Sequence, residues 1–419
     1  MRAIGPASAT LLPATAPIVI DSAAAEVMRV LRKRGHISRT EISGVTGWSK
    51  AKASQEICRL IDRGLLVETG EGASQGGRRP KLLRLNERLG YVIGIDIGAS
   101  SIEMVLADVT GRVLQRTGAA ADVREPPEKF FEQCMELAAR MVGDQAAQPG
   151  EILGFGVGVP GPVDFAQAVL VAPPLMPHWE DFPIRSFIKS RFPSAFVIVD
   201  NDVNIMALGE QRAGDGEGID HFIYVKIGTG IGAGIVSNGR IHRGSDGCAG
   251  DIGHICVDKL GPTCRCGNKG CLEAMAAGPA IAEKAVQAAR SGLSPLMRQL
   301  MDANNGVLHP EDVNAACREG DEAALEIIRS SGQMVGDVLA SLVNFFNPSH
   351  IFIGGGIASF GNHLLVAIRR AVLRRSLPLA TNHLAINFSR AGSNAGTIGA
   401  VALALEYLFI VQDDPHAIV

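Results

Sequence analysis

The sequence predicts an α/β protein in which a winged helix-turn-helix module precedes a larger body of two similar lobes. The first ninety residues show helical hydrophobic spacing, and a strand–glycine loop–strand arrangement then occurs twice. A chain of 419 residues is also too long for one compact core. The predicted parts are a flexible N-terminus (1–20), the winged module (21–88), a first lobe (89–200), a second lobe (201–395) and a helix (about 396–409) that returns to the first lobe.

The overall composition excludes several classes of protein. Hydrophobic residues make up 47% and charged residues 20%, a balance that excludes a largely disordered chain. No apolar run reaches the ~18–20 residues that a membrane-spanning helix needs. Pro6, Pro13 and Pro17 interrupt the apolar N-terminus, which argues against a secretory signal. We therefore expect a soluble, cytoplasmic protein that does not bind membranes.

The charge is distributed unevenly along the chain. Residues 1–90 contain fifteen Lys and Arg against eight Asp and Glu, a balance of +7, whereas the remaining residues have a balance of −10. A basic module attached to an acidic body is typical of a protein whose smaller part binds nucleic acid. Charge alone does not distinguish this from a chance excess of solvated basic side chains.

The hydrophobic spacing after residue 20 predicts three helices. The first covers Asp21–Lys33, the second begins after Ser38 with Glu41 as its capping-box partner, and the third covers Ser49–Arg63. This order of a helix, a short helix, a glycine turn and a longer helix is that of a helix-turn-helix. The residues expected to face the interior of the module are Ala24, Val27, Val30, Leu31, Ile42, Val45, Ala53, Ile57, Leu60 and Ile61.

The start of the third helix carries a group of side chains that can bind DNA. They are donors to phosphates and base edges, as expected where such a helix enters the major groove. The group consists of Ser49, Lys50, Lys52, Ser54 and Gln55. A three-helix bundle without a partner would show the same apolar spacing but would not need this group.

The next segment predicts a wing. Leu65–Val67 and Leu82–Leu85 are expected to form two short strands joined by a Gly-, Ser- and Arg-rich loop. Arg78 and Arg79 lie at its tip, and Pro80 favours an extended backbone before it. Two guanidinium groups on an extended arm suit a narrow minor groove. The alternative is a solvated linker loop.

Two glycine loops in the body predict a site for phosphate groups. One follows the strand Val92–Ile95 and the other follows the strand Phe222–Ile227, and such loops offer backbone N–H groups to anionic oxygens. The acid that ends the first strand, Asp96, can hold Mg²⁺ through water. The alternative is that the glycines serve hairpins with positive φ. The candidate residues are Asp96, Gly98, Ser100, Gly228, Thr229, Gly230, Gly232, Gly354, Gly355 and Gly356.

A pair of polar residues lies between the two lobes. Asn201 and Asp202 end a buried strand and precede a helix that begins near Asn204. Ligands bind at the carboxyl ends of strands in open α/β sheets, so Asp202 can act as a general base and Asn201 can position a neighbouring hydroxyl. Asn and Asp are also common helix caps, which is the alternative.

The most specific local pattern consists of His254 followed by Cys264, Cys266 and Cys271. Three thiolates and one imidazole complete a tetrahedral zinc site, so the predicted Zn²⁺ is structural and leaves no position for a catalytic water. Disulfides are the alternative, but they are rare in a reducing compartment. If the metal orders both flanks of the loop, Asp251 and Glu273 can converge on one polyhydroxyl ligand.

Together these residues resemble the ROK family, which contains repressors, open reading frames and sugar kinases. The resemblance runs from about residue 20 to 409. Cys264–Glu273 is similar to the cysteine signature of the family, Asp251–His254 to its E-x-G-H element, and Ser38–Glu41 and Gly77–Pro80 to the winged helix of its repressors. The resemblance implies an actin-like, ribonuclease H-like body with sugar contacts at Asn201, Asp202, Asp251, His254 and Glu273.

Three departures from the family pattern bear on function. Kinase members carry D-x-G-G-T-K in the first glycine loop, where this chain has Ala99 and Ser101 at the second glycine and the lysine. Asp251 replaces a glutamate of the sugar kinases, and Pro174 stands where many sugar-binding members have asparagine. The first departure weakens the case for ATP binding, and the other two affect the identity of the sugar.

We therefore expect a DNA-binding transcriptional regulator, acting as a repressor, that responds to a sugar. Since two-fold operators are read by dimers, we expect a homodimer or homotetramer. The alternative is a sugar kinase with a fused DNA-binding module, which requires ATP and Mg²⁺ and uses Asp202 as its catalytic base.

Overall fold

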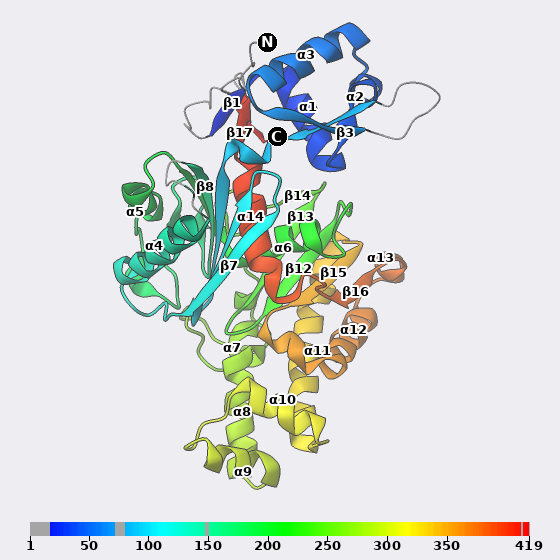
Figure 1. Cartoon of the computed structure of the whole chain (residues 1–419). Coiled ribbons are helices and arrows are strands. Elements are labelled where there is room, and N and C mark those ends of the chain that lie inside the picture. The colour runs from blue at the N-terminus through cyan, green and yellow to red at the C-terminus, as the bar shows by residue number, and fades with distance from the viewer. Residues whose placement is uncertain (1–16, 72–79, 146, 148–150, 412–413, 419) are drawn as a thin grey trace.

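The computed structural model shows a head at the N-terminus and a body of two lobes (Figure 1). It describes residues 17–71, 80–145, 147, 151–411 and 414–418. Among these residues, no helix is both long enough and apolar enough to cross a membrane.

The head contains three helices and a three-stranded sheet of order β2-β4-β3. The helices are α1 (Ser22–Arg34), α2 (Arg39–Thr46) and α3 (Lys50–Asp62). The strands are β2 (Ile37–Ser38), β3 (Leu66–Glu71) and β4 (Lys81–Leu85). The wing strands are therefore present as predicted, and the short strand β2 is an addition that the sequence pattern did not indicate.

Local signals determine where these helices begin. Ser38 and Glu41 form the predicted capping box of α2, and the Ser49 side chain accepts a hydrogen bond from the Lys52 amide at the start of α3. The prediction that Val45 faces the interior is wrong, because this residue is 50% exposed. It lies in the last turn of the short helix α2, where the core side is already filled by Ile42.

The first lobe is a five-stranded sheet of order β11-β8-β5-β6-β7. Its strands are β5 (Tyr91–Ile97), β6 (Ser101–Asp108), β7 (Val113–Ala120), β8 (Ile152–Val159) and β11 (Phe196–Asn201). It also contains the helices α4 (Pro127–Asp144) and α5 (Ile184–Arg191) and the small hairpin β9 (Val163–Asp164) and β10 (Val169–Leu170).

The second lobe is a five-stranded sheet of order β14-β13-β12-β15-β16. Its strands are β12 (Phe222–Ile227), β13 (Ile231–Ser237), β14 (Arg240–Ile241), β15 (His350–Gly354) and β16 (Ala385–Phe388). Its helices are α7 (Leu272–Ala276), α8 (Gly278–Arg290), α9 (Pro295–Ala303), α10 (Pro310–Arg318), α11 (Glu322–Phe346), α12 (Asn362–Arg375) and α13 (Pro378–Thr381).

The two sheets have the same topology. In each, the first strand pairs antiparallel with the second along the chain and parallel with the fourth strand of its lobe's sheet. The prediction of two similar lobes, made from the repeated glycine loops, is confirmed.

Two helices lie between the sheets and connect the lobes. Helix α6 (Asp202–Ala213) follows the last strand of the first sheet but packs on β12 and β13, whereas α14 (Ala395–Glu406) follows the second sheet and packs on β5 and β8. They approach closely because a Cβ at Gly399 would lie 1.6 Å from the Ile205 carbonyl oxygen. Figure 1 shows α14, in red, running from between the lobes toward the head.

Two predictions about the chain ends need correction. The C-terminal helix ends at Glu406, and Phe409–Val411 form strand β17. Residues 18–20, expected to be flexible, form strand β1, which pairs parallel with β17. Strand β18 (Asp414–Ile418) pairs with the other edge of β17. The head is thus tied to the end of the chain through a small sheet that joins segments almost 400 residues apart.

The head packs on the first lobe through one hydrophobic cluster. Leu31 and Leu83 of the head belong to the same buried cluster as Val105, Leu408 and Phe409 of the body. Arg32 on α1 adds a polar contact, because its guanidinium donates to the Leu405 carbonyl oxygen. The head and the first lobe therefore share a core, and the head is not joined by a linker alone.

Candidate functional site

A cleft of about 790 Å³ opens between the lobes. It gathers most of the ligand-binding residues that the sequence predicts from six separate segments. Those that line it are Ser100, Asn201, Asp202, Gly228, Thr229, Gly230, Gly232, Asp251, His254, Glu273 and Gly356. Four others, Asp96, Gly98, Gly354 and Gly355, are not part of the lining.

Asp96 lies at the end of β5 against the first turn of α14. A Cβ at Gly396 would lie 1.8 Å from a carboxylate oxygen of Asp96, so only glycine allows this approach. Burial raises the pKa of Asp96 to about 7, and the Lys226 ammonium acts in the opposite direction. The negative charge of Asp202 further favours the protonated form of Asp96.

Asn201 and Asp202 occupy the floor of the cleft, at the start of α6. The Asn201 side chain accepts from the Val203 amide at 2.9 Å and donates to the Gly161 carbonyl oxygen at 2.9 Å. The capping role that was the alternative interpretation is therefore present for Asn201. Asp202 is 4% exposed, and Lys226 forms an ion pair with it.

Lys226 is the residue that the sequence analysis missed. It is the one charged residue in β12, directly before the second glycine loop, and it lines the cleft. A charged side chain at the end of a buried strand was the signal available in the sequence.

The glycines of the second loop allow other groups to lie close to its backbone. Gly228, Gly230 and Gly232 are absent from the residues with positive φ, so the hairpin alternative is wrong for them. A Cβ at Gly230 would instead lie 2.5 Å from a carboxylate oxygen of Glu273. Gly355, with φ of 87°, is the candidate glycine that needs the left-handed region.

The four predicted metal ligands form one cluster. The ligand atoms of His254, Cys264, Cys266 and Cys271 all lie within 4.8 Å of one another. The Cys266 and Cys271 sulfurs are 3.7 Å apart, and the His254 Nδ1 is 3.6 Å from the Cys264 sulfur. Thiolates bound at ~2.3 Å to one tetrahedral ion lie roughly 3.7 Å apart, so the spacing fits a metal.

The disulfide alternative does not fit this cluster. A disulfide requires sulfurs about 2.05 Å apart, and every cysteine of the described residues is free. Gly267 and Gly270 adopt positive φ and allow the predicted tight reversal of the loop. Cys256 was not considered as a ligand. It forms a backbone bridge with Cys271, but Cys256 is exposed and is not part of the cluster.

The cluster holds two carboxylates at the edge of the cleft. Nε2 of His254 lies 3.8 Å from Asp251, so the ring contacts the cluster through Nδ1 and the cleft side through Nε2. Glu273 is the second residue of α7, two positions after Cys271, and its carboxylate accepts from the Ile231 amide at 3.2 Å. Asp251, His254 and Glu273 are therefore brought together as predicted.

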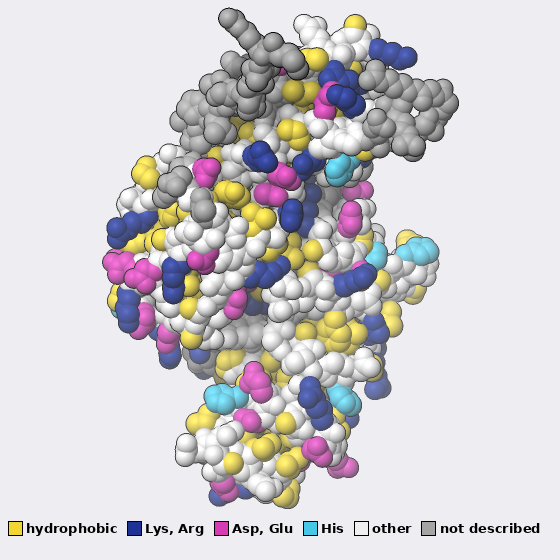
Figure 2. All heavy atoms as spheres, viewed as in Figure 1, with side chains coloured by type: hydrophobic (Ala, Val, Ile, Leu, Met, Phe, Trp, Pro, Cys, Tyr) yellow, Lys and Arg dark blue, Asp and Glu magenta, His cyan; other side chains and the backbone are white. Residues whose placement is uncertain are grey.

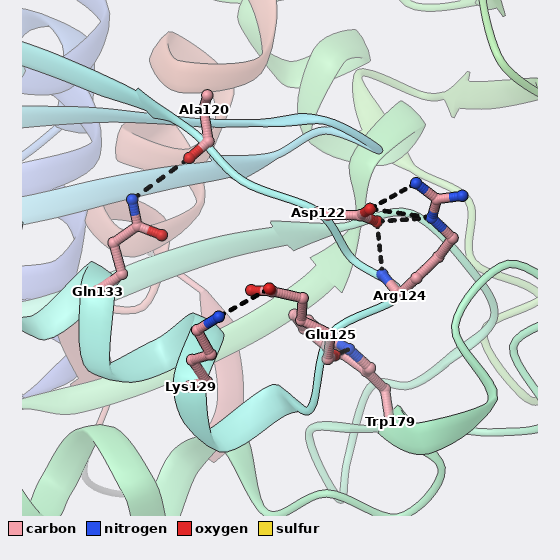
Figure 3. Close-up of polar contacts among 7 residues, drawn as sticks. All are labelled: Ala120, Asp122, Arg124, Glu125, Lys129, Gln133 and Trp179. Carbon is pink, nitrogen blue, oxygen red and sulfur yellow. Dashed lines mark hydrogen bonds and ion pairs between the residues drawn. The ribbon is translucent and has the colours of Figure 1, made fainter.

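The first glycine loop is supported by the segment that follows β7. The Ala121 amide donates to the Ser100 carbonyl oxygen at 3.2 Å. Figure 3 shows how this segment is held: Asp122 binds Arg124, and the Trp179 indole donates to the Glu125 carbonyl oxygen at 3.1 Å. The segment beside the first glycine loop is therefore hydrogen-bonded to the aromatic core of the first lobe through Trp179.

The predicted DNA-binding residues of α3 divide into two groups. Lys50, Lys52 and Gln55 are exposed. Ser49 caps the helix, and the Ser54 hydroxyl accepts from Arg39 at 3.1 Å. Arg78 and Arg79 lie outside the described residues. Figure 2 shows Lys and Arg side chains at the outer end of the head.

Comparison with known proteins places the chain in a family. The family model described as "ROK family" matches residues 92–407. The chain belongs to the ROK family.

Its relatives include transcriptional regulators whose matches cover most of the chain. A xylose repressor of Caldicellulosiruptor bescii is 33% identical over 90% of this chain and 94% of its own length. The transcriptional dual regulator NagC of Escherichia coli is 31% identical over 90% of this chain and 91% of its own.

Two solved structures distinguish the head from the body. A ROK family transcriptional regulator, a homologue of the E. coli MLC protein, is 27% identical with a TM-score of 0.76, covering 89% of this chain and 92% of its own. A ROK glucokinase of Streptomyces griseus, solved with glucose and AMPPNP, is 30% identical with a TM-score of 0.64. The latter covers 75% of this chain but 99% of its own, which confirms the predicted sugar-kinase type of the body.

Proposed function

We propose that the protein is a sugar-responsive, DNA-binding transcriptional repressor. The observation that carries the proposal is that a winged helix-turn-helix shares a hydrophobic core with a body whose cleft gathers polar side chains suited to a polyol. Relatives that match the chain over both parts are repressors, whereas the glucokinase structure matches three quarters of it.

The sugar contacts come from the carboxylates and the histidine of the cleft. Asp202, Asp251 and Glu273 can accept hydrogen bonds from hydroxyl groups, and Nε2 of His254 faces the same space. One N–H of the Asn201 amide donates to Gly161 and its oxygen accepts from Val203, so the second N–H can still donate to a hydroxyl group of the sugar.

Zn²⁺ is the metal proposed for the cluster of His254, Cys264, Cys266 and Cys271. Three sulfurs and one nitrogen are the donor set of a closed structural zinc site. The ion would keep the loop in shape and thereby fix Asp251 and Glu273 on either side. Zinc analysis of purified protein tests this, with one ion per chain as the expected result.

Helix α14 supplies the connection between cleft and head. Its first turn contacts Asp96 through Gly396, and its last turn presents the Leu405 carbonyl oxygen to Arg32 of α1. Twelve helical residues span ~18 Å as one rigid element. A ligand that shifts α14 would therefore act on its contact with α1.

A second contact line reaches the same end of α14. Asp200, next to Asn201, binds Arg243 at 2.7 Å, and the Arg243 guanidinium lies 4.2 Å from the centre of the Phe165 ring. Phe165 packs on Tyr407, which follows the last residue of α14. This chain of contacts supports coupling, which requires that the ligand bind one arrangement of the lobes more tightly.

The test is a gel-shift assay with DNA from upstream of the protein's own gene, with and without a panel of pentoses, hexoses and N-acetylhexosamines. We expect binding that one sugar weakens. The variant Lys50→Ala/Lys52→Ala should lose binding, because it removes two exposed cations of α3, while Lys189→Ala on the first lobe should not. No binding to any upstream fragment at low salt would refute the proposal.

The proposed assembly is a homodimer or homotetramer, since a two-fold operator is read by two heads. Light scattering of the purified protein at micromolar concentration tests it, and a strictly monomeric species would contradict it.

An ATP-dependent sugar kinase is the competing function, favoured by the similarity of the body to a glucokinase bound to glucose and AMPPNP. In that case Asp202 is the catalytic base, with ATP and Mg²⁺ at the glycine loops. An ADP-release assay with the same sugars decides: turnover that Asp202→Asn abolishes would make the kinase function primary.

A further inference from the structure

The floor of the cleft contains an ammonium group that the proposed function does not use. Lys226 reaches from β12 of the second lobe to Asp202, at the junction of β11 and α6. The side chain of Asp202 is 6% exposed and that of Lys226 is 20% exposed, so this pair lies mostly out of water. The ion pair thus links the two lobes at the bottom of the cleft.

The sheet leaves a path for this long side chain. The residues that pair with Lys226 on the neighbouring strands are Gly232 of β13 and Gly354 of β15. Residues opposite one another in a sheet share a face, so both neighbours on the face of Lys226 lack a side chain. Lys226 can therefore extend across the sheet to the start of α6.

A second carboxylate acts on the same ammonium. Burial opposes the charged form, but Asp202 and Asp96 together raise the pKa of Lys226, which keeps the group protonated. The influence is mutual, since Lys226 lowers the pKa of Asp96 against the effect of burial. Asp96 lies near the end of β5 and Asp202 begins α6 directly after β11, so both carboxyl groups come from the side of the first lobe, whereas the ammonium comes from the second.

Two carboxylates at a cleft next to a glycine loop are the usual setting for a divalent cation that neutralises phosphate. Here the chain itself places one cationic group against Asp202, and burial favours the protonated, uncharged form of Asp96. We propose that Lys226 is a built-in cation that occupies the position beside Asp202 where a divalent metal ion would bind, so that the cleft binds an uncharged sugar without such an ion. The ammonium binds one of the two carboxylate oxygens of Asp202, which leaves the other oxygen to accept from a hydroxyl group of the sugar.

This inference deepens the proposed function, because it explains how a kinase-like cleft serves as a sensor. Its test uses no DNA, so either proposal can fail without the other.

The test is Mn²⁺ binding, followed by electron paramagnetic resonance, to the full chain supplied with one equivalent of Zn²⁺. Mn²⁺ prefers oxygen ligands, so it reports the carboxylates and not the cysteines. The wild type should show no Mn²⁺ site in the cleft. Lys226→Met, which keeps an unbranched side chain one atom shorter and removes the charge, should bind Mn²⁺ more tightly by about tenfold or more.

Three variants make the result specific. Lys226→Arg keeps a cation and should behave like the wild type, and Lys189→Met, at an exposed lysine, is the matched control. The double variant Asp96→Asn/Lys226→Met should lose the Mn²⁺ site again. If Lys226→Met unfolds without metal, Mn²⁺ should restore its thermal transition.

Two results would overturn the inference. One is a Mn²⁺ site in the wild type that Asp96→Asn removes, because the position would then be open to a metal. The other is a Lys226→Met variant whose Mn²⁺ affinity equals that of the wild type and whose melting temperature does not respond to Mn²⁺.

Discussion

The two lobes have the same sheet but different connections. Between β7 and β8 the described residues of the first lobe form one helix, α4, whereas between β14 and β15 the second lobe contains the cysteine loop and helices α7–α11. Asp251, His254 and Glu273 all come from this insertion. The duplicated sheets therefore provide the framework, and the insertion in one copy provides most of the candidate ligand chemistry.

The cores of the lobes differ as well. In the first lobe Phe131 contacts a group of rings that includes Trp179 and Phe182. In the second lobe the long helix α11 packs on α12 through Gly332 and Gly336, with a mainly aliphatic core. Aromatic packing thus stabilises the first lobe. Close helix packing and the cluster of metal-ligand residues stabilise the second.

Removing one residue of the metal-ligand cluster should have the largest effect, because only the second lobe depends on this cluster. Cys271→Ser leaves three ligands, so we expect metal affinity to fall by at least about a hundredfold and the cleft to lose its sugar-induced thermal shift. Metal content and thermal melting measure this. Cys58→Ser, at an exposed cysteine of the head, should retain both, and a Cys271→Ser protein with a full equivalent of metal would contradict the prediction.

Truncating the aromatic core tests the first lobe. Phe131 is fully buried, so Phe131→Ala should lower the free energy of unfolding by ~3–5 kcal/mol. Urea denaturation measures the loss. Phe345→Ala on α11, where the ring is 89% exposed, should change stability by less than ~0.5 kcal/mol. Equal losses at the two positions would show that this core does not hold the lobe.

The contact between the lobe-connecting helices gives a smaller effect. Gly399→Ala places a Cβ against the Ile205 carbonyl oxygen, so we expect a loss of ~1–3 kcal/mol in place of the usual gain from alanine in a helix. Gly143→Ala on α4 is the matched control: its Cβ meets nothing within 4 Å, and it should stabilise by up to ~1 kcal/mol. A stabilising Gly399→Ala would mean that α6 and α14 are not in close contact.

A further expected effect is a pH dependence of stability from Asp96. Its pKa in the folded protein, about 7, lies above the ordinary value of 3.8. The folded state therefore binds the proton more tightly, and this contribution to stability is greatest at low pH and declines as the pH rises to about 7. In Asp96→Asn, the free energy of unfolding measured with urea should decline less between pH 3.8 and about pH 7. Parallel profiles for the two proteins would argue against a protonated carboxyl in the fold.

Sequence reasoning succeeded where the signal is local. The capping box of Ser38 and Glu41, the strand Phe222–Ile227 and the cysteine cluster all depend on residues close together along the chain. The two-lobed body could also be predicted, because the same local pattern occurs twice.

It failed where distant segments meet. The pairing of Lys226 with Asp202, the strand formed by residues 18–20 and the end of α14 depend on tertiary contacts that no local pattern specifies. The serines of α3 show a related limit, since a hydroxyl that suits a phosphate also suits a helix cap or a neighbouring arginine.

The pairing of β1 with β17 has a consequence for synthesis. The head is made first, but the strand that it pairs with ends at Val411, more than 300 residues after the wing. At ~5–20 residues per second, the ribosome needs roughly 15 to 60 seconds to reach that strand. During this interval β1 lacks its partner strand, and the contacts of the head with Leu408 and Phe409 can form only after those residues have left the ribosome.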